Sequence, residues 1–108
     1  MNGKFFEMKK VLLVGKLLKN VPSEKELTIK DVKYFAASDF KEVKEVFANN
    51  TIDIVIMGAG IELEKRLEVV DYIFKTSNTT SVHMKDWETG SKGFVPFINH
   101  VLKGLLEK

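Results

Sequence analysis

The sequence of 108 residues contains no cysteine. A disulfide framework, a thiolate nucleophile, a cysteine-based zinc site and thiol redox chemistry are therefore excluded. Proline is also scarce, with two residues in the chain, and no low-complexity segment divides the sequence. Because this length can enclose one modest core without metal or disulfide support, we expect a single domain over residues 1–108.

Long apolar runs are also missing. No window approaches the roughly 18 to 20 apolar residues of a membrane span, and residues 1–8 lack the apolar core of a secretory signal. We therefore expect a cytoplasmic protein with no membrane partner. Residues 1–7 are expected to form a loosely held N-terminal extension, or to pack their two phenylalanines over a sheet edge.

Neither sign of charge dominates the chain. Seventeen Lys and Arg residues stand against 15 Asp and Glu residues, which gives a net charge of +2 and a pI near 8.8. The two signs alternate along the chain instead of forming runs, so the composition does not favour a nucleic-acid partner.

Two continuous apolar segments are present, and each ends at a glycine. Ile54–Met57 leads into Gly58, and Val11–Val14 leads into Gly15. Apolar residues without alternation are typical of strands that are covered on both faces, as in parallel sheets flanked by helices. We expect these two strands to be neighbours in the middle of one sheet.

Weaker patterns surround them. A short or irregular helix is expected near Ser23–Leu27, where Ser23 and Glu26 have capping-box spacing. Further elements are predicted as an edge strand over Asp31–Ser38, helices over Phe40–Ala48 and Ile61–Lys75, a short edge strand over Ser81–Met84, and a last helix beginning between Gly93 and Val95. In the helix over Ile61–Lys75, the apolar positions are expected to face the core and the charged ones the solvent: Leu63, Leu67, Val70, Ile73 and Phe74 inward, with Glu62, Glu64, Lys65, Arg66 and Glu68 outward.

This alternation of strands and helices predicts the fold. It indicates a three-layer α/β/α sandwich around a four-stranded parallel sheet of order 2-1-3-4, a flavodoxin-like layout. Ligands of open parallel sheets bind beyond the carboxyl ends of the strands, where the strand order reverses. The candidate ligand-binding residues at that edge are Gly15, Lys16, Ser38, Asp39, Gly58, Ala59, Gly60, Glu62, His83, Asp86 and Trp87.

The turn Gly58–Gly60 precedes a helix, and glycines in such a turn allow backbone N–H groups to approach an anion. The third glycine of a dinucleotide fingerprint is absent, because Leu63 occupies its place, and Glu62 opposes a phosphate. A plain tight turn is the alternative interpretation.

His83 and Asp86 form the only plausible acid–base pair, against the alternative of an edge histidine with a chance neighbour. Trp87 can anchor a partner or planar ligand, or merely cover the end of the core. No ligand pair has metal-binding spacing, so no metal or cofactor is expected.

The segments Lys9–Val14 and Asp53–Met57 resemble the corresponding strands of bacterial response-regulator receiver domains, over roughly residues 8–108. Receivers carry an acidic pair after the first strand and a phosphoacceptor aspartate at the end of the third, which together bind Mg²⁺. Gly15, Lys16 and Gly58 stand at those positions here. The resemblance therefore implies a degenerate domain that is not phosphorylated on aspartate. Four-stranded phosphotransferase-system domains are similar too, but they carry a cysteine after the first strand.

Three functions follow, in this order. The first is a non-catalytic regulatory or protein-interaction module that binds a protein partner or itself. The alternative is a small-ligand or nucleotide/phosphate-binding domain that uses the Gly58–Glu62 turn and the loop after His83. An enzyme that uses His83 and Asp86 comes third.

Overall fold

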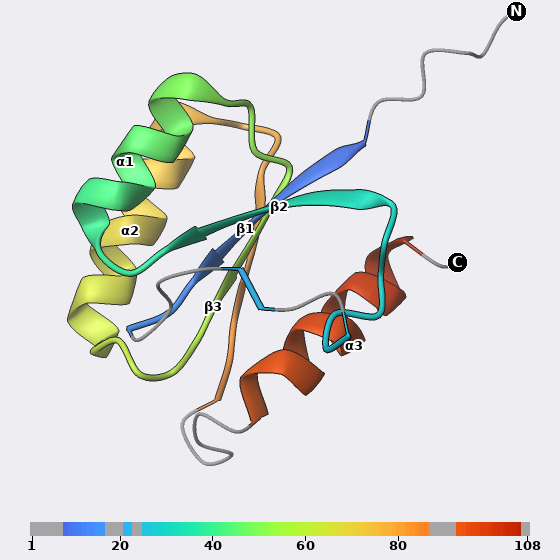
Figure 1. The fold of residues 1–108 in the computed structure, drawn as a ribbon. Helices are drawn as coiled ribbons and strands as arrows, with labels where there is room; N and C mark the ends of the chain where they lie inside the picture. Colours follow the sequence, from blue (N-terminus) through green and yellow to red (C-terminus); the bar gives the residue numbers. More distant parts are fainter. Residues whose placement is uncertain (1–7, 17–20, 23–24, 87–92, 107–108) are drawn as a thin grey trace, which may run out of the picture.

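A computed structural model describes residues 8–16, 21–22, 25–86 and 93–106. These residues form four strands and three helices (Figure 1). In chain order they are β1 (Lys9–Val14), β2 (Val32–Ala37), α1 (Phe40–Asn49), β3 (Ile54–Met57), α2 (Leu63–Thr76), β4 (Ser81–Met84) and α3 (Phe94–Leu106). Residues 1–7 and Trp87, for which the sequence made predictions, lie outside the described residues.

The strands form one parallel sheet of order β2-β1-β3-β4, as the sequence predicted. In register, Val11 of β1 lies between Tyr34 of β2 and Ile54 of β3. The pairing continues past the ends of the strands, because the N–H of Gly15 donates to the Ala37 carbonyl at 3.0 Å and the N–H of Gly58 to the Val14 carbonyl at 2.8 Å. The two glycines that end the apolar runs therefore still belong to the sheet.

Two buried clusters lie on opposite faces of the sheet. Successive side chains of a strand point to opposite faces, so each apolar strand contributes to both clusters. Leu12 and Val14 pack with Val43 of α1 and Val69 and Ile73 of α2. The other cluster joins sheet residues to α3 and to one loop residue: Val11, Leu13, Ile54, Ile56, Ile98, Leu102 and Leu27. The result is the three-layer α/β/α arrangement, with α1 and α2 on one side and α3 on the other (Figure 1).

The predicted helix near Ser23–Leu27 is not found in its described part, because Lys25 and Glu26 form a turn and Leu27 is in irregular structure. Asn99 of α3 holds this segment instead. Its side-chain oxygen accepts the Thr28 N–H at 3.0 Å, and its amide nitrogen donates to the Glu26 carbonyl at 2.9 Å. The backbone groups that a helix would have used are thus paired with another element, and Leu27 reaches the core from a loop.

The predicted core face of α2 is also wrong. Arg66, Val69 and Ile73 are its buried residues, whereas Leu63, Leu67 and Phe74 are exposed. Periodicity alone favoured the apolar residues for the inward face, but the helix is rotated so that the arginine turns inward. The Arg66 guanidinium donates from Nη1 to the Lys85 carbonyl at 3.2 Å, which supplies a buried partner for its charge.

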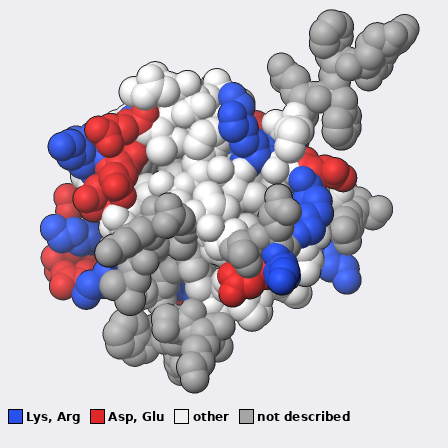
Figure 2. Space-filling model, in the orientation of Figure 1, with Lys and Arg blue, Asp and Glu red and all other residues white. Residues whose placement is uncertain are grey.

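Charge is mixed over the surface. Figure 2 shows basic and acidic side chains side by side around an uncharged central area on the face in view. Among the described residues, no helix combines the length and apolar character needed to cross a membrane.

Candidate functional site

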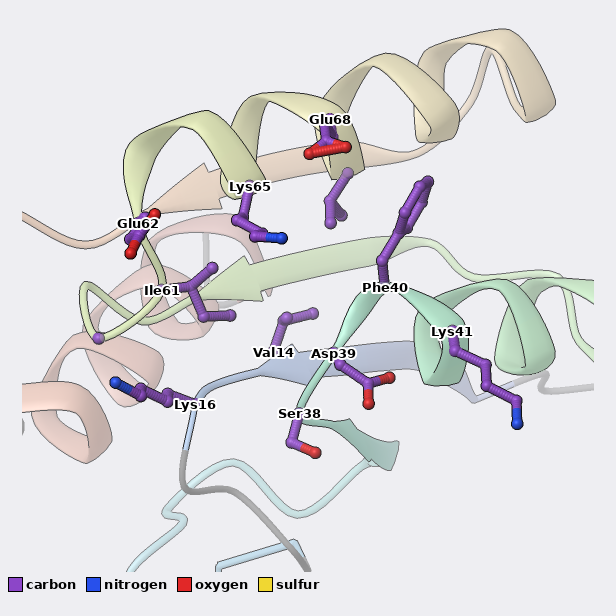
Figure 3. A pocket seen from close by; sticks show the side chains of 12 residues that line it. Val14, Lys16, Ser38, Asp39, Phe40, Lys41, Ile61, Glu62, Lys65 and Glu68 are labelled. Carbon is purple, nitrogen blue, oxygen red and sulfur yellow. The ribbon is translucent and has the colours of Figure 1, made fainter.

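A crevice of about 480 Å³ opens at the carboxyl ends of the strands, between the start of α1 and the start of α2 (Figure 3). Its position follows from the strand order, because the crossovers from β1 and β3 leave the sheet in opposite directions there. The lining residues come from the ends of β1 and β2 and from the first turns of the two helices: Val14, Lys16, Ser38, Asp39, Phe40, Lys41, Gly60, Ile61, Glu62, Lys65, Glu68 and Val69.

Apolar side chains make the inner wall of the crevice. Val14 is fully buried, Val69 is buried, and Phe40 and Ile61 are half-buried. The Phe40 ring is held from outside by an edge-to-face contact with Tyr72, with ring centroids 5.6 Å apart. One wall of the crevice is thus a fixed aromatic ring, a surface that suits a planar ligand.

Polar groups on the α1 side are already paired with one another. Asp39 caps α1 by accepting the Glu42 N–H at 2.8 Å. Glu42 in turn accepts the Ser38 N–H at 2.6 Å and the Ser38 hydroxyl at 2.7 Å, and these bonds lower the pKa of the Glu42 carboxyl. The start of α1 is therefore closed by its own carboxylates and does not offer its N–H groups to an anion.

The start of α2 is different. Glu62 occupies the cap position of α2, but its side chain makes no capping hydrogen bond. The first bond of the helix runs from the Arg66 N–H to the Glu62 carbonyl at 3.0 Å. The first-turn N–H groups of α2, beside the crevice, therefore lack the side-chain acceptor that α1 has.

Three lysines and three acids surround the opening: Lys16, Lys41, Lys65, Asp39, Glu62 and Glu68. Asp39 is committed to its helix cap. Neither Lys16 nor Lys65 takes part in an ion pair with another described residue. Figure 3 shows the Lys65 side chain extended across the crevice toward α1. The ammonium group of Lys65 is thus placed to meet a ligand instead of a protein carboxylate.

The structure brings five of the predicted site residues to this crevice: Lys16, Ser38, Asp39, Gly60 and Glu62. Gly15, Gly58 and Ala59 lie buried beside it and support it from below. A Cβ atom at Gly58 would lie 3.6 Å from the Phe94 ring, on the side of α3. Gly58 therefore contributes backbone to the sheet edge and not a ligand-facing group.

His83 and Asp86 lie apart from the crevice. His83 pairs in register with Ile56, which belongs to the cluster on the α3 side of the sheet. Its Nε2 lies 3.1 Å from the Ser81 hydroxyl, and burial lowers the pKa of its imidazole. Asp86 lies beside the Lys85 ammonium, with Oδ1 3.7 Å from Nζ. The expected acid–base pair is thus not formed in the crevice, and Trp87 lies outside the described residues.

The sequence did not point to four lining side chains: Phe40, Ile61, Lys65 and Glu68. A usable signal was present. Starting from Ile61 after the glycine turn, Lys65 and Glu68 follow at helical spacing, so all three share one side of the helix. A search of the first two turns after each strand end, beyond the turns themselves, would have found them.

Within the described ranges, no three His, Asp or Glu side chains come together in a way that could hold a metal ion. Comparison of the chain with protein-family models, with curated proteins and with solved structures gave no match. The function is therefore argued from the geometry of the crevice.

Proposed function

We propose that this protein is a small-ligand-binding domain and that the crevice between α1 and α2 is its site. The observation that carries the proposal is a cavity of about 480 Å³ at the reversal point of a parallel sheet. Ligand pockets usually measure roughly 300 to 1,000 Å³, and in open α/β sheets they form at this point. The volume is many times the roughly 30 Å³ share of one water molecule, so it suits an organic ligand better than a bare inorganic ion.

The lining indicates the class of ligand. Apolar side chains and the Phe40 ring suit a planar organic body, and the amines of Lys16 and Lys65 suit one anionic group. Glu62 and Glu68 at the opening can accept hydrogen bonds from ligand hydroxyl groups. A nucleoside monophosphate combines these three features, and we propose this class.

Isothermal titration calorimetry with the four common nucleoside monophosphates tests the proposal. We expect saturable binding of at least one nucleotide, and much weaker binding of inorganic phosphate. Removal of one charge-assisted hydrogen bond costs roughly 1.5 to 3 kcal/mol, so Lys65→Ala should weaken binding about tenfold or more.

Lys103→Ala is the matched control, because Lys103 is an exposed lysine of α3 on the other side of the sheet. It should leave the affinity unchanged. The proposal fails if no nucleotide binds, or if the two lysine variants lose affinity equally.

A degenerate receiver-like relationship stays part of the proposal. The positions where receivers hold acids are Gly15, Lys16 and Gly58 in this chain. We therefore propose ligand binding without phosphoryl transfer to aspartate, in a protein that acts as a regulatory module of the cytoplasm.

A protein-interaction function has a separate observation in its favour, namely the exposed apolar side chains of α2. These lie on a different side of the helix from the crevice.

A further inference from the structure

Four apolar residues form a stripe along α2, named here the α2 stripe: Leu63, Leu67, Val70 and Phe74. Leu63 is 56% exposed, Leu67 50% and Phe74 57%, while Val70 is half-buried. Large apolar side chains that are exposed together mark interaction surfaces more often than isolated ones do. The stripe therefore calls for an explanation that a single exposed leucine would not.

The α2 stripe lies on the side of the helix that faces away from α1. Tyr72, on the α1 side, contacts the rings of both Phe40 and Phe47. The helical period places the stripe residues about half a turn away from Tyr72. The strand order puts β4 at the edge beyond β3, and Met84 of β4 is 41% exposed. The stripe and the edge of β4 thus share the same margin of the molecule, separate from the crevice.

The spacing of the stripe reads the same in both directions. Four, three and four residues separate its successive members. We propose that α2 packs antiparallel against α2 of a second copy of this chain, around a two-fold axis between Leu67 and Val70. Leu63 then lies opposite Phe74 of the partner subunit, and Leu67 lies opposite Val70 of the partner subunit. A two-fold interface requires one surface to complement itself, and a palindromic stripe does so.

Charge complementarity favours a second copy as the occupant. In this register, Glu62 at the start of α2 faces Lys75 of the partner subunit, and the same contact repeats across the axis. The antiparallel order also opposes the two helix dipoles favourably. A parallel pair would instead set Glu62 and Glu64 against the same acids of the partner. The sequence of α2 thus disfavours the parallel alternative.

The expected strength follows from the size of the surface. One helix and the margin of one strand per subunit fall at or below the low end of the roughly 1,200 to 2,000 Å² that stable interfaces bury. We therefore expect reversible dimers with micromolar dissociation constants, a monomer–dimer equilibrium that sedimentation velocity can follow over a range of concentrations.

Cysteine cross-linking tests the geometry, because the chain has no cysteine of its own and each introduced thiol is unique. A mixture of the Leu63→Cys and Phe74→Cys variants should form a disulfide-linked heterodimer under mild oxidation. Each variant alone should cross-link poorly, because in the antiparallel register two copies of position 63 lie about 16 Å apart along the helices. Efficient self-cross-linking of each variant alone would overturn the antiparallel arrangement.

A charge at the centre of the stripe gives an independent test in the otherwise unchanged protein. Leu67→Glu places two carboxylates near the axis and should abolish the concentration-dependent increase in mass. Met8→Glu is the control, since Met8 is also an exposed apolar residue, 47% accessible, but precedes β1. Circular dichroism shows whether both variants remain folded. The proposal is overturned if the parent protein is monomeric up to near-millimolar concentration, or if both variants alter its mass equally. Nucleotide binding by a Leu67→Glu monomer would show that the crevice acts independently.

Discussion

At the scale of single residues, the sites of partly buried polar groups explain how pH should act on this protein. Burial lowers the pKa of His83 below its ordinary value of 6.5. The unfolded chain therefore takes up the imidazole proton at a higher pH than the folded chain does. Hydrogen bonds from Ser38 lower the pKa of Glu42 below 4.5, so this carboxyl acts in a separate and more acidic window.

We predict that the free energy of unfolding decreases as the pH falls through 6.5 toward the lower pKa of folded His83. His83→Gln should flatten this part of the stability profile, because glutamine takes up no proton. Urea unfolding at closely spaced pH values measures the effect. His100→Gln, at an exposed position of α3, is the control and should leave the slope in place. An unchanged slope in His83→Gln would contradict the assignment.

The contribution of Glu42 has the opposite arrangement in pH. It is fully present above 4.5 and is lost as the pH falls toward the lower pKa of the folded state. The two groups can therefore be separated in one titration of stability.

At the scale of elements, the sequence predicted the strands well because continuous apolar runs have few other interpretations. The start of α3 near Phe94 was also predicted, since Pro96 is tolerated only in the first turn of a helix. The inward face of α2 was not predicted. Its most apolar side is exposed, and Arg66 is buried because the Lys85 carbonyl accepts its hydrogen bond. Such a partner is nineteen residues away and leaves no local signal.

The loop at Lys25–Lys30 failed for a related reason. Its backbone partner is Asn99, 71 residues from Thr28. Local capping-box spacing favoured a short helix, but the two hydrogen bonds to Asn99 and the burial of Leu27 stabilise an irregular segment instead. Propensity is a weak guide where tertiary contacts supply the backbone partners.

We predict that Asn99→Ala destabilises the protein by about 1 to 2 kcal/mol, because two hydrogen bonds between α3 and the loop are lost. Chemical unfolding of the variant and of the parent measures this difference. His100→Ala, at the neighbouring exposed position, should change stability by less than about 0.5 kcal/mol. Equal stability of Asn99→Ala and the parent would show that the loop does not depend on this side chain.

At the scale of the whole molecule, alternating strands and helices determined the topology, and the topology determined where a ligand can bind. That is why residues directly after β1 and β2, such as Lys16 and Ser38, were found in advance at the crevice. His83 was misplaced because strand-end reasoning does not say on which face of the sheet a side chain lies. The side chains deeper in α2 were missed because their position depends on how that helix is rotated.

The central claim is that the crevice between α1 and α2 binds a small organic anion, and backbone amide NMR tests it most directly. Titration with the nucleoside monophosphate that binds best in calorimetry should shift the amide signals of Lys16, Ser38 and the segment Gly60–Lys65. The amides of α3 should stay in place. Shifts that are confined to α3 or the β4 edge, or no shifts at all, would contradict the account.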